Sequence, residues 1–244
     1  TNIVYASYIN KTSFENSVEK ISLNNDKEVF SINKIIYFSS AGATTNVNNG
    51  NLNIKNLFQY TDIAIYINNN ANDKNYSLEN TLKSVYIDNI NYSKTPEIGN
   101  PELYYKNINN FAQDIFIKDN KIKDQLMFDV TSEDTLDYSE AILYNNCANP
   151  ITLSYLNNNI KSNYSLTNSQ TAITYDGSLL KKNNILLNSI ACSFSFNINI
   201  VNNLDEKFIC PVYINIPLSN QKTSIYSGSF TLIDNTNYTF FRYK

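Results

Sequence analysis

Residues 190–201 read IACSFSFNINIV, and this stretch decides the fold class. From Ile190 to Ile200 an apolar side chain occupies every second position, and Ala, Ser and Asn occupy the positions between. Successive side chains of a β-strand point to opposite faces of its sheet. The pattern therefore predicts a strand with one buried face and one polar face.

Stretches of this kind recur along the whole chain. They are rich in Ile, Val, Tyr, Phe and Thr, and clusters of Asn, Asp, Ser and Gly separate them. Many short strands with polar connections predict an all-β fold, an antiparallel β-sandwich. The predicted strands are 3–9, 29–38, 57–67, 83–92, 102–106, 125–130, 141–145, 151–156, 172–176, 185–201, 208–216, 225–233 and 237–243.

Helical patterns are few. Thr12 and Glu15 have the spacing of a capping box, and Phe14, Val18 and Ile21 follow at helical spacing, which predicts a short helix at 13–21. A second helical turn is predicted at 107–115. The Asn-rich segments 46–53 and 68–77 are interpreted as long surface loops.

Length and composition are those of one globular unit. The chain has 244 residues, of which 42% are hydrophobic and 17% are charged, and no linker divides it. We therefore expect a single sandwich domain over residues 1–244. No apolar run approaches the roughly 20 residues of a membrane-spanning helix, and the first residues, TNIVYASYIN, lack the features of a secretory signal. We expect a soluble protein with no membrane span.

The charges argue against direct binding of nucleic acid. The 19 basic and 22 acidic residues are scattered, and Arg242 is the only arginine. Proteins that bind nucleic acids usually carry a basic stripe and use arginine to contact phosphates and bases.

The chain has little catalytic chemistry. It contains no histidine, which excludes Ser-His-Asp and Cys-His nucleophiles, and its five glycines form no phosphate-binding loop. A glycoside hydrolase built on two carboxylates stays open as an alternative. The acidic stretch 129–140 is interpreted as a solvated turn, with Ca²⁺ binding as the alternative. We predict no catalytic residue, no metal site and no cofactor, and thus not an enzyme.

Three cysteines are present, and none is part of a Cys-x-x-Cys pair that would indicate zinc. Cys192 lies on the apolar face of its predicted strand, as expected for a small buried side chain. Cys210 can face it from a neighbouring strand, so a disulfide between them is the alternative. An odd number of cysteines favours a reducing compartment.

The chain has 19 tyrosines. Because the ring is apolar and the hydroxyl can stay in contact with water, tyrosine suits half-buried sheet surfaces and also interfaces. The densest aromatic stretch is NYTFFRYK at the carboxyl end. A terminal strand of this kind pairs within the fold or docks on a neighbour.

Residues 92–111 read YSKTPEIGNPELYYKNINNF, with two prolines five apart around Gly99 and a strand directly afterwards. The stretch predicts a tight excursion between two antiparallel strands. Together with FQYTDIAIYI before it and SGSFTLIDNTNYTF near the end, it resembles the minor jelly-roll capsid proteins of large AT-rich DNA viruses of the nucleocytoplasmic type. The resemblance implies a jelly-roll sandwich without catalytic residues, packed among other capsid proteins.

We therefore expect a structural virion protein, a minor capsid or penton-like subunit. Its partners would be other capsid proteins and copies of itself, and it would be made in the host cytoplasm and located in the virion. The alternative is a carbohydrate- or receptor-binding sandwich of an adhesin or toxin, secreted or at a cell surface. The residues predicted to make contacts are Tyr104, Tyr105, Phe240, Phe241 and Tyr243.

Overall fold

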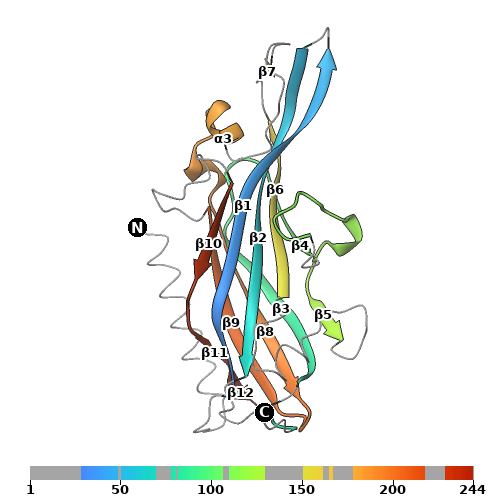
Figure 1. Ribbon diagram of the computed structural model, residues 1–244, viewed down its shortest axis with the longest axis vertical. Helices are drawn as coiled ribbons and strands as arrows, with labels where there is room; N and C mark the ends of the chain where they lie inside the picture. Colours follow the sequence, from blue (N-terminus) through green and yellow to red (C-terminus); the bar gives the residue numbers. More distant parts are fainter. Residues whose placement is uncertain are drawn as a thin grey trace.

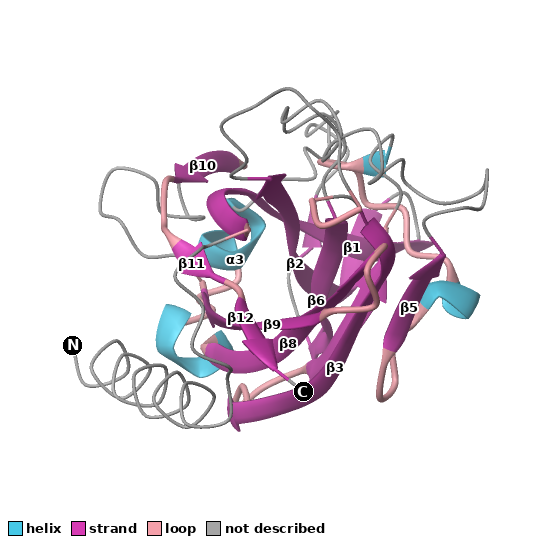
Figure 2. Ribbon diagram, turned by 90° about the horizontal axis from the view of Figure 1, so that it is seen from below, coloured by secondary structure: helices cyan, strands magenta, loops and turns pink. Residues whose placement is uncertain are grey.

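The computed structural model describes residues 29–48, 51–69, 78–80, 82–106, 110–129, 151–161, 165–166, 178–217 and 229–243. Within them, two antiparallel β-sheets pack face to face (Figures 1 and 2). Some predicted features lie outside these residues: the strands 3–9, 141–145 and 172–176, the helix 13–21, Cys147 and most of the acidic stretch 129–140.

The larger sheet has seven strands, and β10, β1, β2, β6 and β4 follow one another across it. β11 pairs with β1, and β7 pairs with β2. Its strands are β1 (Phe30–Asn48), β2 (Asn51–Asn69), β4 (Asn100–Tyr105), β6 (Ile151–Lys161), β7 (Ser165–Leu166), β10 (Phe230–Asp234) and β11 (Tyr238–Thr239).

The smaller sheet has five strands in the order β12, β9, β8, β3 and β5. The alternating stretch 190–201 supplies β8, the central strand of this sheet. The strands are β3 (Leu82–Lys94), β5 (Leu126–Asp129), β8 (Cys192–Asn202), β9 (Lys207–Ile216) and β12 (Phe241–Tyr243). In the part of the chain that the structure describes, the short helices are α3 (Ser178–Lys182) and two 3-10 turns, η2 (Lys118–Asn120) and η3 (Leu187–Ile190).

The predicted class, an antiparallel β-sandwich with short helices, is confirmed. The hairpins β1–β2 and β8–β9 each stay within one sheet, and the two sheets hold seven and five of the described strands. The jelly-roll subtype stays a prediction.

Alternation places the core between the sheets. On β8 the side chains of Cys192, Phe194, Phe196, Ile198 and Ile200 are each at most 1% exposed, as the opening pattern predicted. Facing them, the larger sheet presents the apolar positions of β1, β2 and β6. The ring of Tyr155 on β6 stacks on that of Phe194, with ring centroids 5.7 Å apart. Burial of such rings is the main force that holds the two sheets together.

Two local predictions were wrong. The segment 46–53 is not a loop, because β1 and β2 stay paired as far as Asn48 opposite Asn51. The predicted strand 185–201 begins only at Cys192, because η3 precedes it. Of the predicted helical turn 107–115, residues 107–109 lie outside the described residues, and Asn110 to Gln113 form a turn in which the Gln113 N–H donates to the Asn110 carbonyl.

The segment with Pro96, Gly99 and Pro101 was expected to make a tight excursion between two antiparallel strands, and its role in the structure is larger. It connects β3 of the smaller sheet to β4 of the larger one, so it crosses from one layer to the other. Gly99 has a φ of 90°, and a Cβ there would collide with the side-chain amide of Asn157. Only glycine fits this crossing without strain.

The register of β8 and β9 places Pro211 and the two described cysteines. Pro211 lies beyond Ile209, where pairing of β9 with β12 ends, so its missing N–H leaves no gap in that ladder. Cys192 is opposite Ile216 and Cys210 is opposite Ile198. Both thiols are buried and neither is part of a disulfide, so the alternative of a Cys192–Cys210 disulfide is wrong.

Candidate functional site

The five residues predicted to make contacts do not form one surface. Tyr104 is 8% exposed on the outer face of the larger sheet, and Tyr105, on the next position, packs against the core. Phe240 is 4% exposed and meets the ring of Phe30 edge-on at 6.4 Å. Phe241 and Tyr243 are half-buried in β12. Tyr104 and Phe240 therefore contribute mainly to the fold of this chain.

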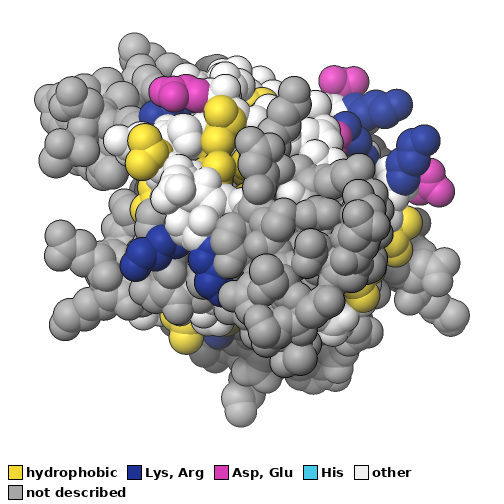
Figure 3. All heavy atoms as spheres, turned by 90° about the horizontal axis from the view of Figure 1, so that it is seen from above, with side chains coloured by type: hydrophobic (Ala, Val, Ile, Leu, Met, Phe, Trp, Pro, Cys, Tyr) yellow, Lys and Arg dark blue, Asp and Glu magenta, His cyan; other side chains and the backbone are white. Residues whose placement is uncertain are grey.

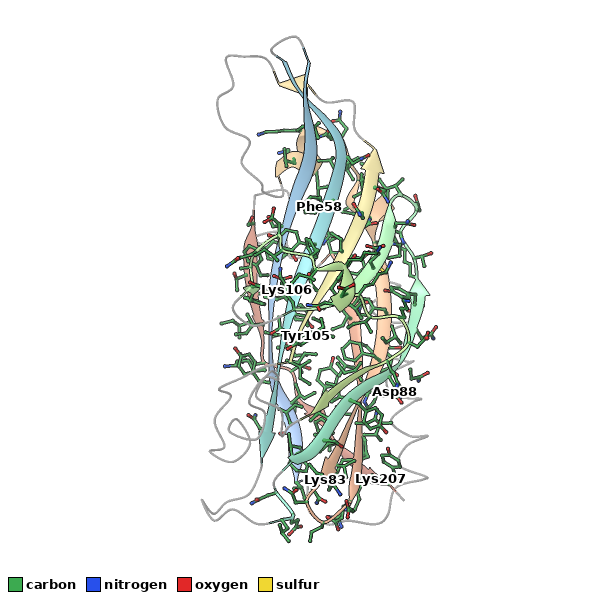
Figure 4. The ribbon with its side chains drawn as sticks, turned by 90° about the vertical axis from the view of Figure 1, so that its right-hand side faces the viewer. Phe58, Lys83, Asp88, Tyr105, Lys106 and Lys207 are labelled. Carbon is green, nitrogen blue, oxygen red and sulfur yellow. The ribbon has the colours of Figure 1, made fainter. Side chains whose placement is uncertain are left out.

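The first candidate site is the outer face of the larger sheet. The segment 110–117 crosses it, so side chains that point away from the core become enclosed a second time. We call this region the capped face, and Figure 4 shows Phe58 and Lys106 within it. Its members are Phe38, Phe58, Tyr60, Asp62, Tyr104, Lys106, Phe111 and Phe116.

An ion pair lies at the centre of the capped face. The Lys106 ammonium donates to both carboxylate oxygens of Asp62, with Nζ 2.8 Å from Oδ2 and 3.1 Å from Oδ1. The two side chains are 2% and 0% exposed. The capping segment adds two contacts, because the Ala112 N–H donates to Asp62 Oδ2 at 2.7 Å and the Gln113 carbonyl accepts from Lys106 Nζ.

Aromatic rings enclose the same pair. Lys106 Nζ lies 5.3 Å from the ring centroid of Tyr60 and 5.1 Å from that of Phe116. Both distances are within the range of cation–π attraction. The charge of Lys106 is thus balanced by a carboxylate, a carbonyl and two ring faces, in place of water.

Burial opposes ionisation of both partners. It raises the pKa of Asp62, although the neighbouring Lys106 ammonium acts to lower it. Burial also lowers the pKa of Lys106, although Asp62 acts to raise it. Both pKa shifts favour the neutral forms of the pair, which are the carboxylic acid of Asp62 and the amine of Lys106.

A second ion pair marks the rim of the capped face. Lys121 Nζ donates to Glu102 Oε1 at 2.6 Å, and the Tyr104 hydroxyl donates to Glu102 Oε2 at 2.7 Å. Lys121 is 40% exposed and Glu102 is 20% exposed, so this pair is in contact with water. Partial burial acts to raise the pKa of Glu102, but the hydrogen bonds from Lys121 and Tyr104 outweigh it and lower that pKa.

The second candidate site is on the opposite side of the sandwich, as Asp88 and Lys106 show in Figure 4. On the outer face of the smaller sheet, Asn199 donates from Nδ2 to Asp88 Oδ1 at 2.8 Å. The Tyr243 hydroxyl lies 3.5 Å from Asn199 Oδ1, and burial and the neighbouring Tyr86 raise the pKa of Tyr243. We call these four side chains, from β3, β8 and β12, the ladder face.

A polar layer also crosses the interior between the main core and a smaller apolar cluster beside α3. Thr61 Oγ1 is 2.8 Å from Ser39 Oγ and accepts from Gln59 Nε2 at 2.9 Å. Asn157 donates from Nδ2 to the Ile98 carbonyl at 3.0 Å. Gln59 Oε1 and Asn157 Oδ1 are buried without a hydrogen-bond partner among the described residues. The layer fixes the register of β2 and β6, in which Gln59 and Asn157 are directly opposite.

The third candidate site is the far end of the β1–β2 hairpin. Pairing of β2 with β6 ends at Asn56, and pairing of β1 with β10 ends at Ser39. Beyond Ile54 the hairpin has only β7 beside it among the described strands, and it extends past the sandwich at the top of Figure 1. We call this part, with Thr45–Asn48, Asn51–Asn53 and β7, the arm.

The charged surface agrees with the scattered charges of the sequence. On the face shown in Figure 3, the described Lys and Arg side chains lie in separate small groups. Arg242 forms an ion pair within the chain, with an Nη1 to Glu206 Oε1 distance of 2.9 Å. Among the described residues, no group of His, Cys, Asp and Glu is arranged to hold a metal ion, and no helix is long and apolar enough to cross a bilayer.

Comparison of the chain with protein-family models, with curated proteins and with solved structures finds no match to any of them. The candidate sites therefore rest on the geometry of this molecule.

Sequence reasoning did not identify the ion pair. Asp62 and Lys106 each occupy a polar position of an alternating strand, where a charged side chain is ordinarily solvated. The nearest signal was the apolar pattern of Ile108, Phe111 and Ile115 just after β4, which was interpreted as a helical turn. The rings of Phe111 and Phe116 cover the capped face.

Proposed function

We propose that this chain is a structural assembly subunit, a virion protein of the minor capsid or penton-like type, that docks laterally on neighbouring protein subunits. The arm is the observation that carries the proposal. A subunit of this kind needs contact surfaces and no catalytic centre, and its copies are arranged around symmetry axes.

Among the described residues, the arm consists of the end of the β1–β2 hairpin and the two residues of β7. A narrow sheet of this kind is marginal in water by itself, because its stability needs further strands or a helix to bury an apolar face. The register places Val47, Leu52 and Leu166 in one cross-strand row, and Asn46, Asn53 and Ser165 in the next. Apolar and polar residues therefore alternate from row to row along the arm, a pattern that suits seating on a neighbouring subunit.

The sheet edges favour docking through side chains over strand addition. The four edge strands are short: β10 has five residues, β4 six, β12 three and β5 four. Short edges discourage uncontrolled pairing with other sheets. Exposed apolar side chains offer contacts instead: Ile233 of the edge strand β10 is 56% exposed, and Ile115 and Ile117 of the capping segment are 42% and 50% exposed.

The test removes the arm and leaves the sandwich intact. In the variant, residues 46–53 are replaced by Asn-Gly, which closes a two-residue hairpin between Thr45 and Ile54. Light scattering over a range of concentrations and negative-stain microscopy follow assembly of the full chain and of the variant. We expect the full chain to form discrete symmetric assemblies or to join particles of its partner proteins, and the variant to stay monomeric.

The matched control is Leu204→Ser, which removes a 50% exposed apolar side chain from the β8–β9 turn. That turn is near Lys83 and Lys207, at the other end of the sandwich from the arm (Figure 4). The control should assemble like the full chain, and circular dichroism should show all three proteins folded. A full chain that stays monomeric at every concentration and never joins particles contradicts the proposal, as does equal assembly of the arm variant.

A second candidate function is carbohydrate or receptor binding through the ladder face. Tyrosine rings beside a carboxylate and an amide offer both a stacking surface and hydrogen bonds to hydroxyl groups. Tyr86, Asp88 and Tyr243 are half-buried there, which leaves part of each side chain accessible. A glycan array separates the two functions: binding that Tyr243→Ala abolishes would favour the second, and no binding at millimolar ligand would remove it.

A further inference from the structure

Lys106 and Asp62 come from strands that are not neighbours. β6 lies between β2 and β4, and Asp62, Ser154 and Tyr104 form one row across the three strands. Lys106 follows the end of β4, and its N–H donates to the Thr152 carbonyl at 2.9 Å. Its side chain therefore crosses over β6 to reach the Asp62 carboxylate on the capped face.

This pair is held as reacting groups are held in an active site. Both carboxylate oxygens are within 3.1 Å of the amine nitrogen, and neither side chain is more than 2% exposed. Groups fixed at such separations react with effective molarities of about 10⁵–10⁸ M. The enclosure by Tyr60, Phe116 and the capping segment also keeps out the water that would reverse a condensation.

We propose that Lys106 and Asp62 condense to an amide between Nζ and Cγ, with release of one water molecule. The bond would join β2 and β4 covalently across β6. It would be a side-chain cross-link of the folded chain, formed without a cofactor or a second protein.

The atoms of the step balance as follows. The Lys106 ammonium gives one proton to Asp62 Oδ1, which leaves a neutral amine beside a carboxylic acid. The carboxyl group turns about its Cβ–Cγ bond, and the amine lone pair forms the N–C bond. A second proton then moves from Nζ to Oδ1, the C–Oδ1 bond breaks, and Oδ1 leaves as water with both protons.

The surroundings fit each stage. Burial favours the neutral acid and amine that the first proton transfer produces. The Ala112 N–H, 2.7 Å from Oδ2, can stabilise the negative charge that develops on that oxygen during attack. In the product, the remaining N–H has the Gln113 carbonyl as acceptor, and Oδ2 keeps Ala112 as donor. The amide would leave neither atom unpaired.

The rim ion pair is an internal comparison. Lys121 and Glu102 are closer, at 2.6 Å, but they are 40% and 20% exposed. Water keeps both groups ionised and would hydrolyse an amide between them, so the short distance alone is insufficient for condensation of Lys121 with Glu102. We expect the cross-link only at the enclosed pair.

Mass spectrometry of the denatured full chain tests the proposal without any variant. We expect an intact mass lower than the sequence mass by one water molecule, either when freshly purified or after prolonged incubation at neutral pH. Trypsin should release residues 56–74 joined to residues 95–118, uncut after Lys106, since an acylated lysine is not cleaved. The sequence mass in both samples would overturn the proposal, and so would loss of water without the joined peptide.

Two conservative variants serve as controls. Lys106→Arg keeps the positive charge but lacks the amine, so it should have its full sequence mass and no joined peptide. Lys121→Arg changes the rim pair in the same way and should still lose one water molecule. A joined peptide from Lys106→Arg, or its absence from Lys121→Arg, would contradict the assignment to Lys106 and Asp62.

Discussion

The capped face and the ladder face both carry tyrosines and one aspartate on the outer side of a sheet, but they differ in what covers them. Over the larger sheet, segment 110–117 encloses Asp62 completely, and its carboxylate has an ammonium as partner. Over the smaller sheet, Asp88 is only half-buried and has a neutral amide as partner. The same side-chain types therefore lie in a dry environment on one face and a partly wet one on the other.

This difference shows that a sandwich can have a buried region on the outer face of a sheet, in addition to the core between its sheets. A single crossing segment with two phenylalanines turns a polar sheet face into a low-dielectric site, where charges interact strongly and cannot be left unpaired. On the half-buried ladder face, water reaches part of Tyr86, Asp88 and Tyr243 and screens their interactions, so each contributes less. The predictions below measure this contrast.

The largest effect is expected from removal of the enclosed carboxylate. Asp62→Ala leaves the Lys106 ammonium buried without its counter-charge, which typically costs about 3–5 kcal/mol of unfolding free energy. Asp88→Ala on the ladder face removes a partly solvated hydrogen bond and should cost about 1 kcal/mol. Urea denaturation of both variants measures the contrast, and equal losses would show that the capped face is open to water.

The next effect concerns the cover. Phe116→Ala removes a ring that contacts Phe58, Tyr60 and Tyr104 at centroid distances of 6.1, 5.6 and 5.6 Å. The ring is half-buried, so we expect a loss of about 2 kcal/mol, below the range for a fully buried phenylalanine. Phe241→Ala in β12 is the matched change on the other sheet and should cost about 1 kcal/mol. A lower melting temperature for Phe241→Ala than for Phe116→Ala would contradict the role of Phe116 as a cover of this face.

A stabilising substitution is expected in the capping segment. Ala112 has a φ of 62°, a left-handed conformation that costs an alanine about 1 kcal/mol. Ala112→Gly should therefore raise the unfolding free energy by about 0.5 kcal/mol, because part of the gain is offset by the greater freedom of glycine in the unfolded chain. Asn89→Gly, at a φ of 51° in β3, should change little, since asparagine tolerates this region. Destabilisation by Ala112→Gly would contradict the backbone assignment.

The smallest effect belongs to the rim. The pKa of Glu102 is lowered in the folded state, so ionised Glu102 stabilises the fold above its ordinary pKa of 4.5, and this stabilisation is lost as the pH falls through the folded value. Glu102→Gln should cost under about 1 kcal/mol at neutral pH and progressively less in acid. Unfolding free energies of both proteins between neutral and acidic pH measure the difference. A gap that widens in acid would reverse the sign of this argument.

The sequence was most informative where apolar and polar side chains alternate. On β8, alternation identified both the strand and its apolar core face, because a slip of one residue would turn Phe194 and Phe196 out of the core. It did not identify Asn197 and Asn199 of the polar face as buried. Alternation failed at 46–53, where asparagine is a poor strand former and cross-strand pairing overrides that preference. The Asn49-Gly50 pair in that segment is itself a hairpin signal.

The candidate sites were less accessible from sequence. The link between Asp62 and Lys106 depends on β6 lying between β2 and β4, and on a segment that crosses the sheet afterwards. Neither fact is encoded in local periodicity. Tyr104 and Phe240 show the converse: aromatic density predicted contact residues, and the fold uses both rings within its own packing.

The central claim is that segment 110–117 seals the outer face of the larger sheet around Asp62. Amide hydrogen exchange at Ala112 tests it most directly, since this N–H donates to Asp62 Oδ2 at 2.7 Å. We predict exchange as slow as that of the central strands, and faster exchange in Asp62→Ala. Exchange of Ala112 at the rate of an unprotected loop amide in the unmodified sequence would contradict the claim.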